Sequence, residues 1–487
     1  MQLRNLSQES TYLRIGIILL AIISALIAGA SGFVYPSFLS PIIAGGVVAG
    51  VVIIITWLQK PVWAMYAAIF VVLLPIGLIP PQAHSLLNRS ITIIAFVVWV
   101  VDVIINQHRV RWTKTALIML VFLAWGFATL LWSTNLSIGI HILQRYALRF
   151  VLFILLIPNE IRTKDNLDGL MNTLAISGWV LVLVSLYTIM LEGYTPGTRL
   201  EVLNVNENGL GILALITMPG VLWQATQPLT RYKTIKFILA SIYLILVVGL
   251  VAMSGSRGSA LSLFIVLTAF WFWRPTRLWG KVSLIILVLV VLIAPFLFET
   301  TLERFAVIPG DTLLGGREGI WQASRLLILD NPWFGGGIGN ARYSIMAYLS
   351  SFRSTLGFDQ ASIHNPVLTI WSETGVLGMF LYLSVLGSAI WSFVRQYILH
   401  RQERESFLLP YIALISSVFL GYIVSWIKGG GMESGFSYFF LLALLLIPSG
   451  LETKEIDDNM EINSQDVNGD KNLVMEASEQ QPGWSHN

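Results

Sequence analysis

Long apolar runs separated by short polar connections dominate the chain. Runs of about 20 residues are long enough to cross the hydrocarbon core of a membrane as helices. About fourteen such runs occur, so the sequence predicts an all-α, polytopic integral membrane protein. The runs cover residues 13–30, 41–58, 62–80, 90–106, 115–132, 139–157, 168–191, 207–225, 234–253, 257–273, 279–298, 366–394, 407–426 and 435–449. The first run lacks a small-residue cleavage site, and we expect it to be retained.

One connection, residues 299–365, is much longer than the others and differs in pattern. It contains two amphipathic helical patterns, over 316–330 and about 340–352. Asn331 and Pro332 should end the first of them. The sequence therefore predicts a long loop that carries helices of its own.

Glycine residues and helix-capping residues occur near the end of this loop. GGGIGN at 335–340 lacks the preceding strand and the spacing of a dinucleotide motif, so it predicts a hinge or a close-packing turn. Asn365 is a natural cap for the helix that follows, and Pro366 suits its first turn. Gly375 and Gly378 allow close packing or a break in that helix.

These patterns divide the chain into four parts. Residues 1–298 form a transmembrane bundle of about eleven helices, and 299–365 form the long loop. Residues 366–450 hold the C-terminal transmembrane helices. Residues 451–487 have the composition of an acidic, disordered tail.

The distribution of positive charge predicts the orientation. Cytoplasmic loops of membrane proteins retain Lys and Arg. Alternate connections carry about 17 such residues: Arg4, Arg14, Lys60, Arg109, Arg111, Lys114, Arg162, Lys164, Arg231, Lys233, Lys236, Arg274, Arg277, Lys281, Arg395, Arg401 and Arg404. The opposite short connections carry Arg89, Arg199, Arg257 and Lys428. We therefore expect a multi-pass protein of the cell (inner) membrane, with both termini cytoplasmic and the long loop periplasmic or extracellular. His84 and Arg89 should lie solvated in an outer loop.

Overall composition excludes several classes of protein. Of 487 residues, 55% are hydrophobic and 12% charged. A soluble domain does not need so large a share of hydrophobic residues. The net charge is +3, but residues 452–487 hold nine acids and two lysines, which leaves 28 basic and 18 acidic residues elsewhere. Orientation in a membrane explains this imbalance, so no nucleic-acid partner is required. The lack of Cys excludes disulfides, thiol nucleophiles and cysteine metal sites.

Polar side chains interrupt the apolar run at 139–157. His141, Arg145 and Arg149 share one helix face at i, i+4 spacing. Arginine within a membrane is expensive, so this face should point to the bundle interior, a cavity or an anionic group. Snorkelling or pairing with a carboxylate is the simpler alternative. The sharper hypothesis is that Arg145 contributes to an anionic-substrate cavity open to the outer side.

Two outer connections combine Arg with helix-start signals. Arg199 precedes Asn206 and Asn208, and Asn at this position is ordinarily a cap. Arg beside a helix N-terminus is also a plausible anion site. Arg257 is the only charge in the turn SGSRGS. It could anchor a lipid phosphate, but Gly and Ser also leave its guanidinium room to fork onto a phosphate ligand.

Several of these stretches resemble a known family. SGSRGS, the GGR…W that opens the helix at 316–330, NPWFGGGIGNARY and HNPVLTIWSETGVLG are similar, in this order, to the core of the O-antigen ligase and O-antigen polymerase superfamily. Upstream, TRLEVLNVNENGLGIL resembles the family's Arg followed by Asn-Pro-Asn, with Glu207 in the place of Pro. The resemblance covers about residues 199–378.

The resemblance implies glycosyl transfer in the membrane, outside the cytoplasm. The donor would be a glycan on a polyprenyl (undecaprenyl) diphosphate, and no cofactor, metal or nucleotide sugar would be needed. His364 would act at the acceptor hydroxyl, with Asn365 and Glu373 in support. The arginines that would bind the diphosphate are Arg199, Arg257 and Arg317.

Elementary chemistry agrees with these roles. A diphosphate is a good leaving group, and guanidinium groups can stabilise its departing charge without a metal. The acceptor hydroxyl needs a proton acceptor, and His is the side chain poised near neutral pH. Direct displacement would invert the anomeric centre. Glu373 is the alternative base.

Other functions remain open at this point. Within the resemblance we favour a polysaccharide polymerase over a ligase, because about fourteen helices suit it. The acceptor would be another lipid-linked glycan, a lipid or a protein hydroxyl, and partners besides membrane lipids could include chain-length or export proteins. A transporter, of bicarbonate or of lipid-linked glycan, is the main alternative, although no repeat of broken helices occurs in two halves. A third reading is a membrane anchor whose acidic tail binds a cytoplasmic partner.

Overall fold

The computed structural model of the chain describes residues 50, 52–75, 78, 80–193, 200–203, 205–227, 232–297, 317–349, 361–402, 406–428 and 436–451. Every regular element within these residues is a helix, and one isolated β-bridge joins Val202 and Val205. The prediction of an all-α protein is therefore confirmed. The expected run at 13–30, most of the run at 41–58 and the acidic tail lie outside the described residues.

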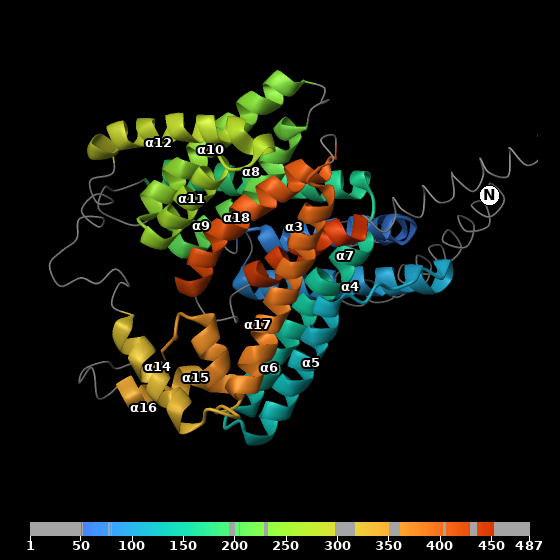
Figure 1. The fold of residues 1–487 in the computed structure, drawn as a ribbon, viewed down its shortest axis with the longest axis vertical. Helices are drawn as coiled ribbons and strands as arrows, with labels where there is room; N and C mark the ends of the chain where they lie inside the picture. The colour runs from blue at the N-terminus through green and yellow to red at the C-terminus, as the bar shows by residue number, and fades with distance from the viewer. Residues whose placement is uncertain are drawn as a thin grey trace, which may run out of the picture.

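The helices are arranged along the chain as Figure 1 shows. They are Val52–Gln59, α3 (Pro61–Leu73), α4 (Pro81–Asn106), α5 (Lys114–Thr129), α6 (Leu136–Arg149), α7 (Ile157–Glu160), α8 (Lys164–Glu192), α9 (Glu207–Thr226), α10 (Lys233–Ser254), α11 (Arg257–Ala269), α12 (Arg277–Leu297), α14 (Glu318–Asp330), α15 (Ala341–Ser344), α16 (Met346–Leu349), α17 (Pro366–His400), α18 (Leu408–Lys428) and Phe436–Leu451. A π-helical stretch, Phe150–Leu156, joins α6 to α7.

Eight helices in the described part of the chain are long and apolar enough to cross a membrane. They are Gln82–Asn106, Lys114–Trp132, Leu136–Glu160, Lys164–Glu192, Glu207–Thr226, Lys233–Ser254, Pro366–His400 and Leu408–Ile427. Val52–Gln59 and α3 add a ninth if a pair bent by 118° forms one span. The structure thus supports a polytopic membrane protein but does not confirm the expected count of about fourteen.

The start of α4 differs from the prediction. His84 and Arg89 lie within this helix and not in a loop, because Pro81 begins it well before the apolar run at 90–106. His84 is only 8% exposed, so it is not the solvated surface residue that we expected. Arg89 is exposed, as predicted.

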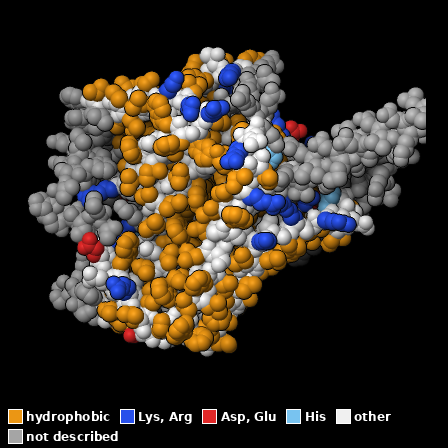
Figure 2. Space-filling view, viewed as in Figure 1, with side chains coloured by type: hydrophobic (Ala, Val, Ile, Leu, Met, Phe, Trp, Pro, Cys, Tyr) orange, Lys and Arg blue, Asp and Glu red, His pale blue; other side chains and the backbone are white. Residues whose placement is uncertain are grey.

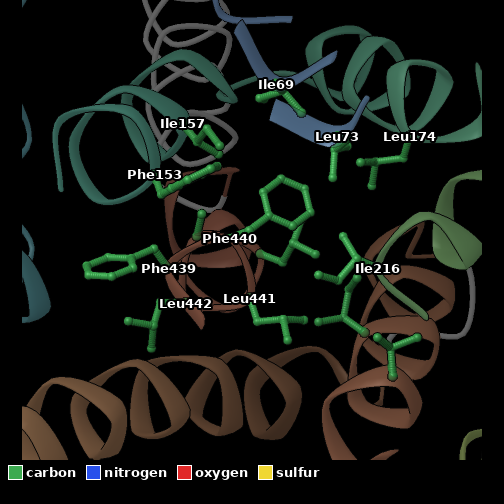
Figure 3. Close-up of a cluster of buried hydrophobic side chains, with 14 of the residues drawn as sticks. Ile69, Leu73, Phe153, Ile157, Leu174, Ile216, Phe439, Phe440, Leu441 and Leu442 are labelled. Atoms are coloured by element: carbon green, nitrogen blue, oxygen red, sulfur yellow. The ribbon is translucent and has the colours of Figure 1, made fainter. Parts of the chain in front are cut away.

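The last described helix, Phe436–Leu451, forms the centre of the bundle. Its side chains are buried on every face from residue 437 onward. Figure 3 shows Phe439 and Phe440 within a shell of apolar side chains from other helices, and Phe153 packs edge-on against Phe440 at 5.6 Å between ring centroids. A helix that is apolar all round is suited to such a buried position.

The outer surface of the bundle is also apolar. Figure 2 shows a broad field of hydrophobic side chains, with many of the Lys and Arg side chains toward its upper and right margins. Large side chains such as Met190 on α8 and Trp391 on α17 are mostly exposed. Exposure of this surface to water would be unfavourable, whereas lipid tails are as apolar as the side chains that form it.

The arrangement of helices leaves one small unit at an edge of the bundle. In Figure 1, α14, α15 and α16 gather at the lower edge, and α17 runs from this region alongside α5. These helices have a separate small core, made by Ala323, Leu327, Ala341, Ile345, Leu349 and Ile363. Arg317, His364, Asn365 and Glu373 lie in or beside this unit.

Candidate active site

His364 lies at the junction between the small unit and α17. The residue before it, Ile363, is 3% exposed in the small core, and its carbonyl accepts a hydrogen bond of 3.1 Å from the Trp321 indole on α14. The residue after it, Asn365, caps α17 by accepting from the Val367 and Leu368 amides at 3.0 and 3.1 Å. Both neighbours of His364 are therefore fixed, and the predicted cap at Asn365 is confirmed.

The backbone of His364 has a φ of 53°, in the left-handed region. L-residues adopt this region rarely, and His is among the more tolerant of them. Such conformations persist where the surroundings determine them, and they gather at functional sites. The backbone conformation at His364 is thus set by its two anchored neighbours.

Arg317 places a positive charge beside His364. It occupies the position just before α14, half-buried, and its carbonyl accepts from the Trp321 amide at 2.9 Å. Burial lowers the pKa of Arg317, but an arginine stays protonated throughout the physiological range. Burial, and then the charge of Arg317, lower the pKa of His364. The imidazole is therefore held in its neutral form at pH 7.

A break in α17 lies a little further along the helix. Gly375 has φ 70° and ψ −173°, which interrupts the helical hydrogen bonds. Two of the carbonyls released by the break accept from the glycine-rich loop: Gly336 donates to Ser372 O at 2.8 Å, and Gly337 to Glu373 O at 2.9 Å. The sequence predicted close packing or a break at Gly375, and the structure shows both. The loop at 335–340 is a close-packing turn.

The two backbones approach so closely that glycine is required on both sides. A Cβ on Gly335, whose φ is 68°, would lie 2.5 Å from the Glu373 carbonyl carbon and 2.6 Å from the Gly375 amide. Trp125 adds an indole hydrogen bond of 2.8 Å to Thr374 O. The loop and the helix therefore form one rigid contact.

The same loop is also fixed to the connection between α5 and α6. The Asn340 side chain accepts from the Asn135 amide at 3.2 Å and donates to Gly336 O at 2.6 Å. The Ile338 amide donates to Thr129 Oγ1 at 3.3 Å. This connection holds the small unit against the bundle.

Glu373 is turned away from solvent. It is 1% exposed, and its carboxylate accepts from the backbone amides of Gly339 and Ala341 at the start of α15. The charge of Arg342 also acts on it. Its Oε1 atom is buried and has no hydrogen-bond partner among the described residues. This setting suits a residue that positions the loop more than a base in contact with an acceptor.

A second set of candidates lies where α9 and α11 begin. Asn206 caps α9 by accepting from the Gly209 amide at 2.7 Å, and Ser256 caps α11 by accepting from Ser259 at 3.2 Å. Ser256 also donates to Asn208 at 2.7 Å, which ties the two helix starts together. The predicted cap is therefore Asn206, and Asn208 links the two turns.

Arg257 is the first residue of α11 and is half-buried beside these two helix N-termini. The chain that leads to α9 is tied to the end of α10, because the Leu200 amide donates to Met253 O at 3.1 Å. Arg199 itself lies outside the described residues. The backbone dipoles of two helices and a guanidinium together offer positive potential to an anion.

Arg145 is half-buried on α6, and its Nε donates weakly to His141 O at 3.4 Å. The charges of Arg342 and Arg89 act on it. Further along the same face, the Arg149 guanidinium lies 5.9 Å from the Phe439 ring centroid. Arg145 is thus influenced by the charges of an arginine on α4 and an arginine on α15. The sequence analysis did not predict this relation.

The structure therefore divides the candidates into two main sets. His364 and Arg317 lie together in the small unit, and Asn206, Asn208 and Arg257 lie together at the starts of α9 and α11. Figure 1 shows these helices apart in the view, with α14 to α16 at the lower edge and α9 and α11 above them.

Sequence reasoning assigned no role to two residues of this region. Trp321 fixes the segment before His364, and Arg342 faces Glu373. The position of Trp321 one turn after Arg317 on the amphipathic helix was a usable signal. Arg342 stands inside the motif NPWFGGGIGNARY, but nothing local in the sequence indicates that it lies near α6.

Comparison with known proteins identifies part of the chain. Residues 242–383 match a family described as O-Antigen ligase. Five candidates fall inside this match: Arg257, Arg317, His364, Asn365 and Glu373. The other four precede it: Arg145, Arg199, Asn206 and Asn208. Among the curated proteins no match is found.

One solved structure is similar over a larger part of the chain. It is described as "Structural coordination of polymerization and crosslinking by a peptidoglycan synthase complex", with 17% identity over 69% of this chain and 97% of that chain. Its TM-score of 0.35 is too low to support an argument.

The family match and the membrane-spanning helices together indicate a multi-pass inner-membrane protein that processes glycans as a ligase or polymerase. Over residues 242–383 the chain is similar to the family described as O-Antigen ligase.

Proposed function

We propose that the chain is a membrane glycosyltransferase that uses a glycan on a polyprenyl (undecaprenyl) diphosphate as its donor. It transfers the glycan to an acceptor hydroxyl on the outer side of the membrane, and we favour polysaccharide polymerisation over ligation. The observation that carries the proposal is the pairing of His364, fixed by both neighbours, with Arg317. Their position inside the matched family domain supports it.

His364 acts as the general base in this proposal. Its lowered pKa keeps the imidazole neutral, so it can accept the proton of the acceptor hydroxyl. The acceptor oxygen forms a bond to the anomeric carbon as the bond from that carbon to the phosphate oxygen breaks. The displacement inverts the anomeric centre. Arg317 stabilises the negative charge that develops on the departing diphosphate, and no metal is needed.

The second set of candidates binds the donor. Arg257 and the N-termini of α9 and α11 hold the diphosphate, with Arg199 contributing from the adjacent connection. Asn206 and Asn208 keep these helix starts in place. The anomeric carbon is bonded directly to a diphosphate oxygen, so Arg257 and Arg317 contact the same diphosphate when that carbon lies at His364.

The loop charges support an orientation with both termini in the cytoplasm and the site outside. A reporter inserted at position 355 should respond from the outer side. A cytoplasmic signal from that position would contradict the orientation.

A transporter is the second candidate, because α17 is interrupted within an apolar span, as transporter helices are. Transporters use the backbone groups freed by such a break to bind substrates. In this chain Gly336 and Gly337 occupy the carbonyls of Ser372 and Glu373. The break therefore serves to dock a loop, which favours the transferase.

The purified chain in liposomes, supplied with lipid-linked glycan, tests the proposed reaction. Gel analysis should show a ladder of products, and activity should persist with a chelator present. A single transferred product on an added acceptor would indicate ligation. Absence of transfer from a folded, inserted protein would overturn the proposal and favour transport.

A further inference from the structure

Four large apolar side chains are exposed where α14 ends, each by between 42% and 69%. We call them the exposed apolar patch, and they are Leu326, Leu329, Trp333 and Phe334. We propose that this patch inserts into the lipid interface and holds the small unit, with its His364, against the membrane surface. The insertion does not depend on the proposed function, whereas its effect on glycan transfer rests on that function.

The exposed face of α14 changes in character along the helix. Polar side chains such as Gln322 are exposed in its first two turns, whereas Leu326 and Leu329 are exposed near its end. Leu329 follows Gln322 by about two turns, so both side chains lie on one stripe of the helix. The opposite face packs in the small core through Ala323 and Leu327. One end of the stripe therefore suits water, and the other suits an apolar surrounding.

Phe334 joins the patch to the membrane-spanning helix Lys114–Trp132. Its ring centroid lies 6.3 Å from that of Trp125 and 6.0 Å from that of Trp132, and both tryptophans belong to this span. Leu131, next to Trp132, is exposed as well. The patch therefore continues the apolar outer surface of a helix that crosses the membrane.

The segment before Trp333 is fixed to α17 in the same way. The Pro332 carbonyl accepts hydrogen bonds from the Val376 amide at 2.9 Å and from the Trp371 indole at 3.2 Å, and both donors belong to α17. The break at Gly375 lies directly against the backbone of Trp333. The fold therefore sets the position of the patch along two spanning helices.

Two helix lengths place the boundary of the hydrocarbon core at this position. A helix crosses the core in about 20 residues. The span Lys114–Trp132 has 19 residues, so a crossing that starts at its lysine ends at its tryptophan. On α17, a crossing that starts at Arg395 ends near Gly375, about 20 residues away. Both ends contact the patch, so two independent lengths place the patch at one boundary.

The side chains at this boundary have the chemistry of a membrane interface. Tryptophan is enriched at such interfaces because its ring is apolar and its N–H is polar. Trp125, Trp132, Trp333 and Trp371 all belong to the region just described. An amphipathic helix at an interface buries its apolar side chains by about 5 to 10 Å. Lipid is therefore the partner that fits the patch.

Insertion of the patch would set the height of the candidate site. The helical stretch between His364 and Gly375 rises about 15 Å, so His364 lies within about 20 Å of the boundary. The diphosphate of a lipid-linked donor lies in the headgroup layer just outside the same boundary. An anchored small unit is thus held where such a donor presents its reacting group.

Single-cysteine labelling tests the insertion on the full chain, because the natural sequence has no Cys. Leu329→Cys and its control on the same stripe, Gln322→Cys, each carry a fluorescent label in phosphatidylcholine nanodiscs. Nitroxide-bearing lipids quench a label in the membrane, and iodide quenches one in water. We expect nitroxide lipids to quench the label at position 329 at least about twofold more than the label at position 322, and iodide to show the reverse order.

The depth and the partner are tested with the same labels. A nitroxide near the headgroup should quench the label at position 329 more than one near the end of the acyl chain, and the reverse order would overturn the shallow insertion. Equal quenching at positions 322 and 329 would overturn the inference. Protection of position 329 from both quenchers would also overturn it, because protein, such as a second copy of the chain, would then cover the patch.

Transfer kinetics test the effect of the anchor. In nanodiscs, Leu326→Gln/Leu329→Gln should raise the KM for the lipid-linked donor about tenfold, and in detergent, which adapts to the protein surface, by less than about twofold. Gln322→Ala is the matched control and should leave the KM unchanged in both. An equal rise in both media would assign the leucines to a role within the protein and contradict the anchor, as would an unchanged KM in nanodiscs.

The outcomes for the anchor and for the proposed function are distinguishable. Quenching of position 329 by nitroxide lipids in a protein that transfers no glycan would keep the anchor and reject the transferase. Quenching of position 329 by iodide alone in an active protein would reject the anchor and keep the transferase.

Discussion

At the scale of single residues, His364 combines a rare backbone conformation with a lowered pKa. Ile363 is fixed in the small core and Asn365 caps α17, so the chain between them must turn through a φ of 53°. Glycine would adopt this turn more easily than histidine. A histidine at such a position is therefore kept for its side chain, at some expense of stability.

Replacing His364 with glycine tests that interpretation. His364→Gly should raise the free energy of unfolding by about 1 kcal/mol, because the left-handed backbone is no longer strained, and should abolish transfer. Thermal unfolding in detergent measures the first effect. His364→Ala is the control, since it removes the imidazole without relieving the backbone. Retained transfer in the glycine variant would contradict the assigned role.

The pH dependence of transfer follows from the environment of His364. The base must be neutral, so the rate falls as the pH drops through the pKa of His364. Burial and Arg317 lower that pKa below its ordinary value of 6.5, and the acid limb should therefore lie below pH 6.5. In Arg317→Gln the pKa rises and the limb moves to higher pH, along with a loss of rate. The exposed Arg325→Gln should leave the limb in place. An unmoved limb in Arg317→Gln would show that another group is the base.

At the scale of elements, the contact between the glycine-rich loop and the break in α17 organises the candidate site. The loop supplies amide donors to the released carbonyls, and the same loop leads to Arg342 and, through α15 and α16, to the small core. Any change that separates loop from helix should therefore disturb His364 from a distance.

Alanine at Gly375 tests this contact. Gly375→Ala places a Cβ against the Trp333 carbonyl in a backbone conformation with φ 70°, so it should destabilise the protein by about 2 kcal/mol or more. Gly387→Ala on the same helix is the matched control, because no atom lies within 4 Å of its Cβ. Its stability should be unchanged or slightly raised. Equal effects of the two changes would contradict the proposed packing.

Local signals in the sequence predicted several features of these elements correctly. The caps at Asn206 and Asn365, the helix after Arg317 and the break at Gly375 all depend on residues within one or two turns. The start of α4 was placed wrongly, because the apolar run alone does not mark a helix that begins at Pro81 with polar residues.

Long-range relations could not be predicted in the same way. The hydrogen bonds of the loop to Ser372 and Glu373, and the action of the Arg342 charge on Arg145, depend on how distant segments pack. The hydrogen bond from Ser256 to Asn208, which joins the starts of α9 and α11, is another such relation.

At the scale of the whole molecule, apolar helices have two different surroundings: some face lipid, and one is enclosed by protein. The run at 435–449 was predicted as a membrane span, and Phe436–Leu451 is in fact packed on all sides by protein. Hydropathy cannot distinguish these settings, because lipid tails are as apolar as leucine side chains. Burial within the bundle is what makes this helix the centre of the fold.

Two leucines should therefore respond differently to truncation. Leu444→Ala removes a side chain that is 0% exposed and should cost about 2 to 5 kcal/mol of stability through the cavity left behind. Leu183→Ala on α8 removes one that is 59% exposed and should cost less than about 1 kcal/mol. Thermal unfolding in one detergent compares them. A larger effect at Leu183 would contradict the central position of Phe436–Leu451.

Glycan transfer by purified variants tests the central claim most directly. Arg257→Ala, Arg317→Ala and His364→Ala are compared with the wild type and with Arg325→Ala, using the same lipid-linked donor and confirming insertion of each protein. The account predicts that each of the three variants loses at least about 100-fold in rate, because each removes a charge or a base from the transition state, while Arg325→Ala stays active. Full activity in all three variants would contradict it.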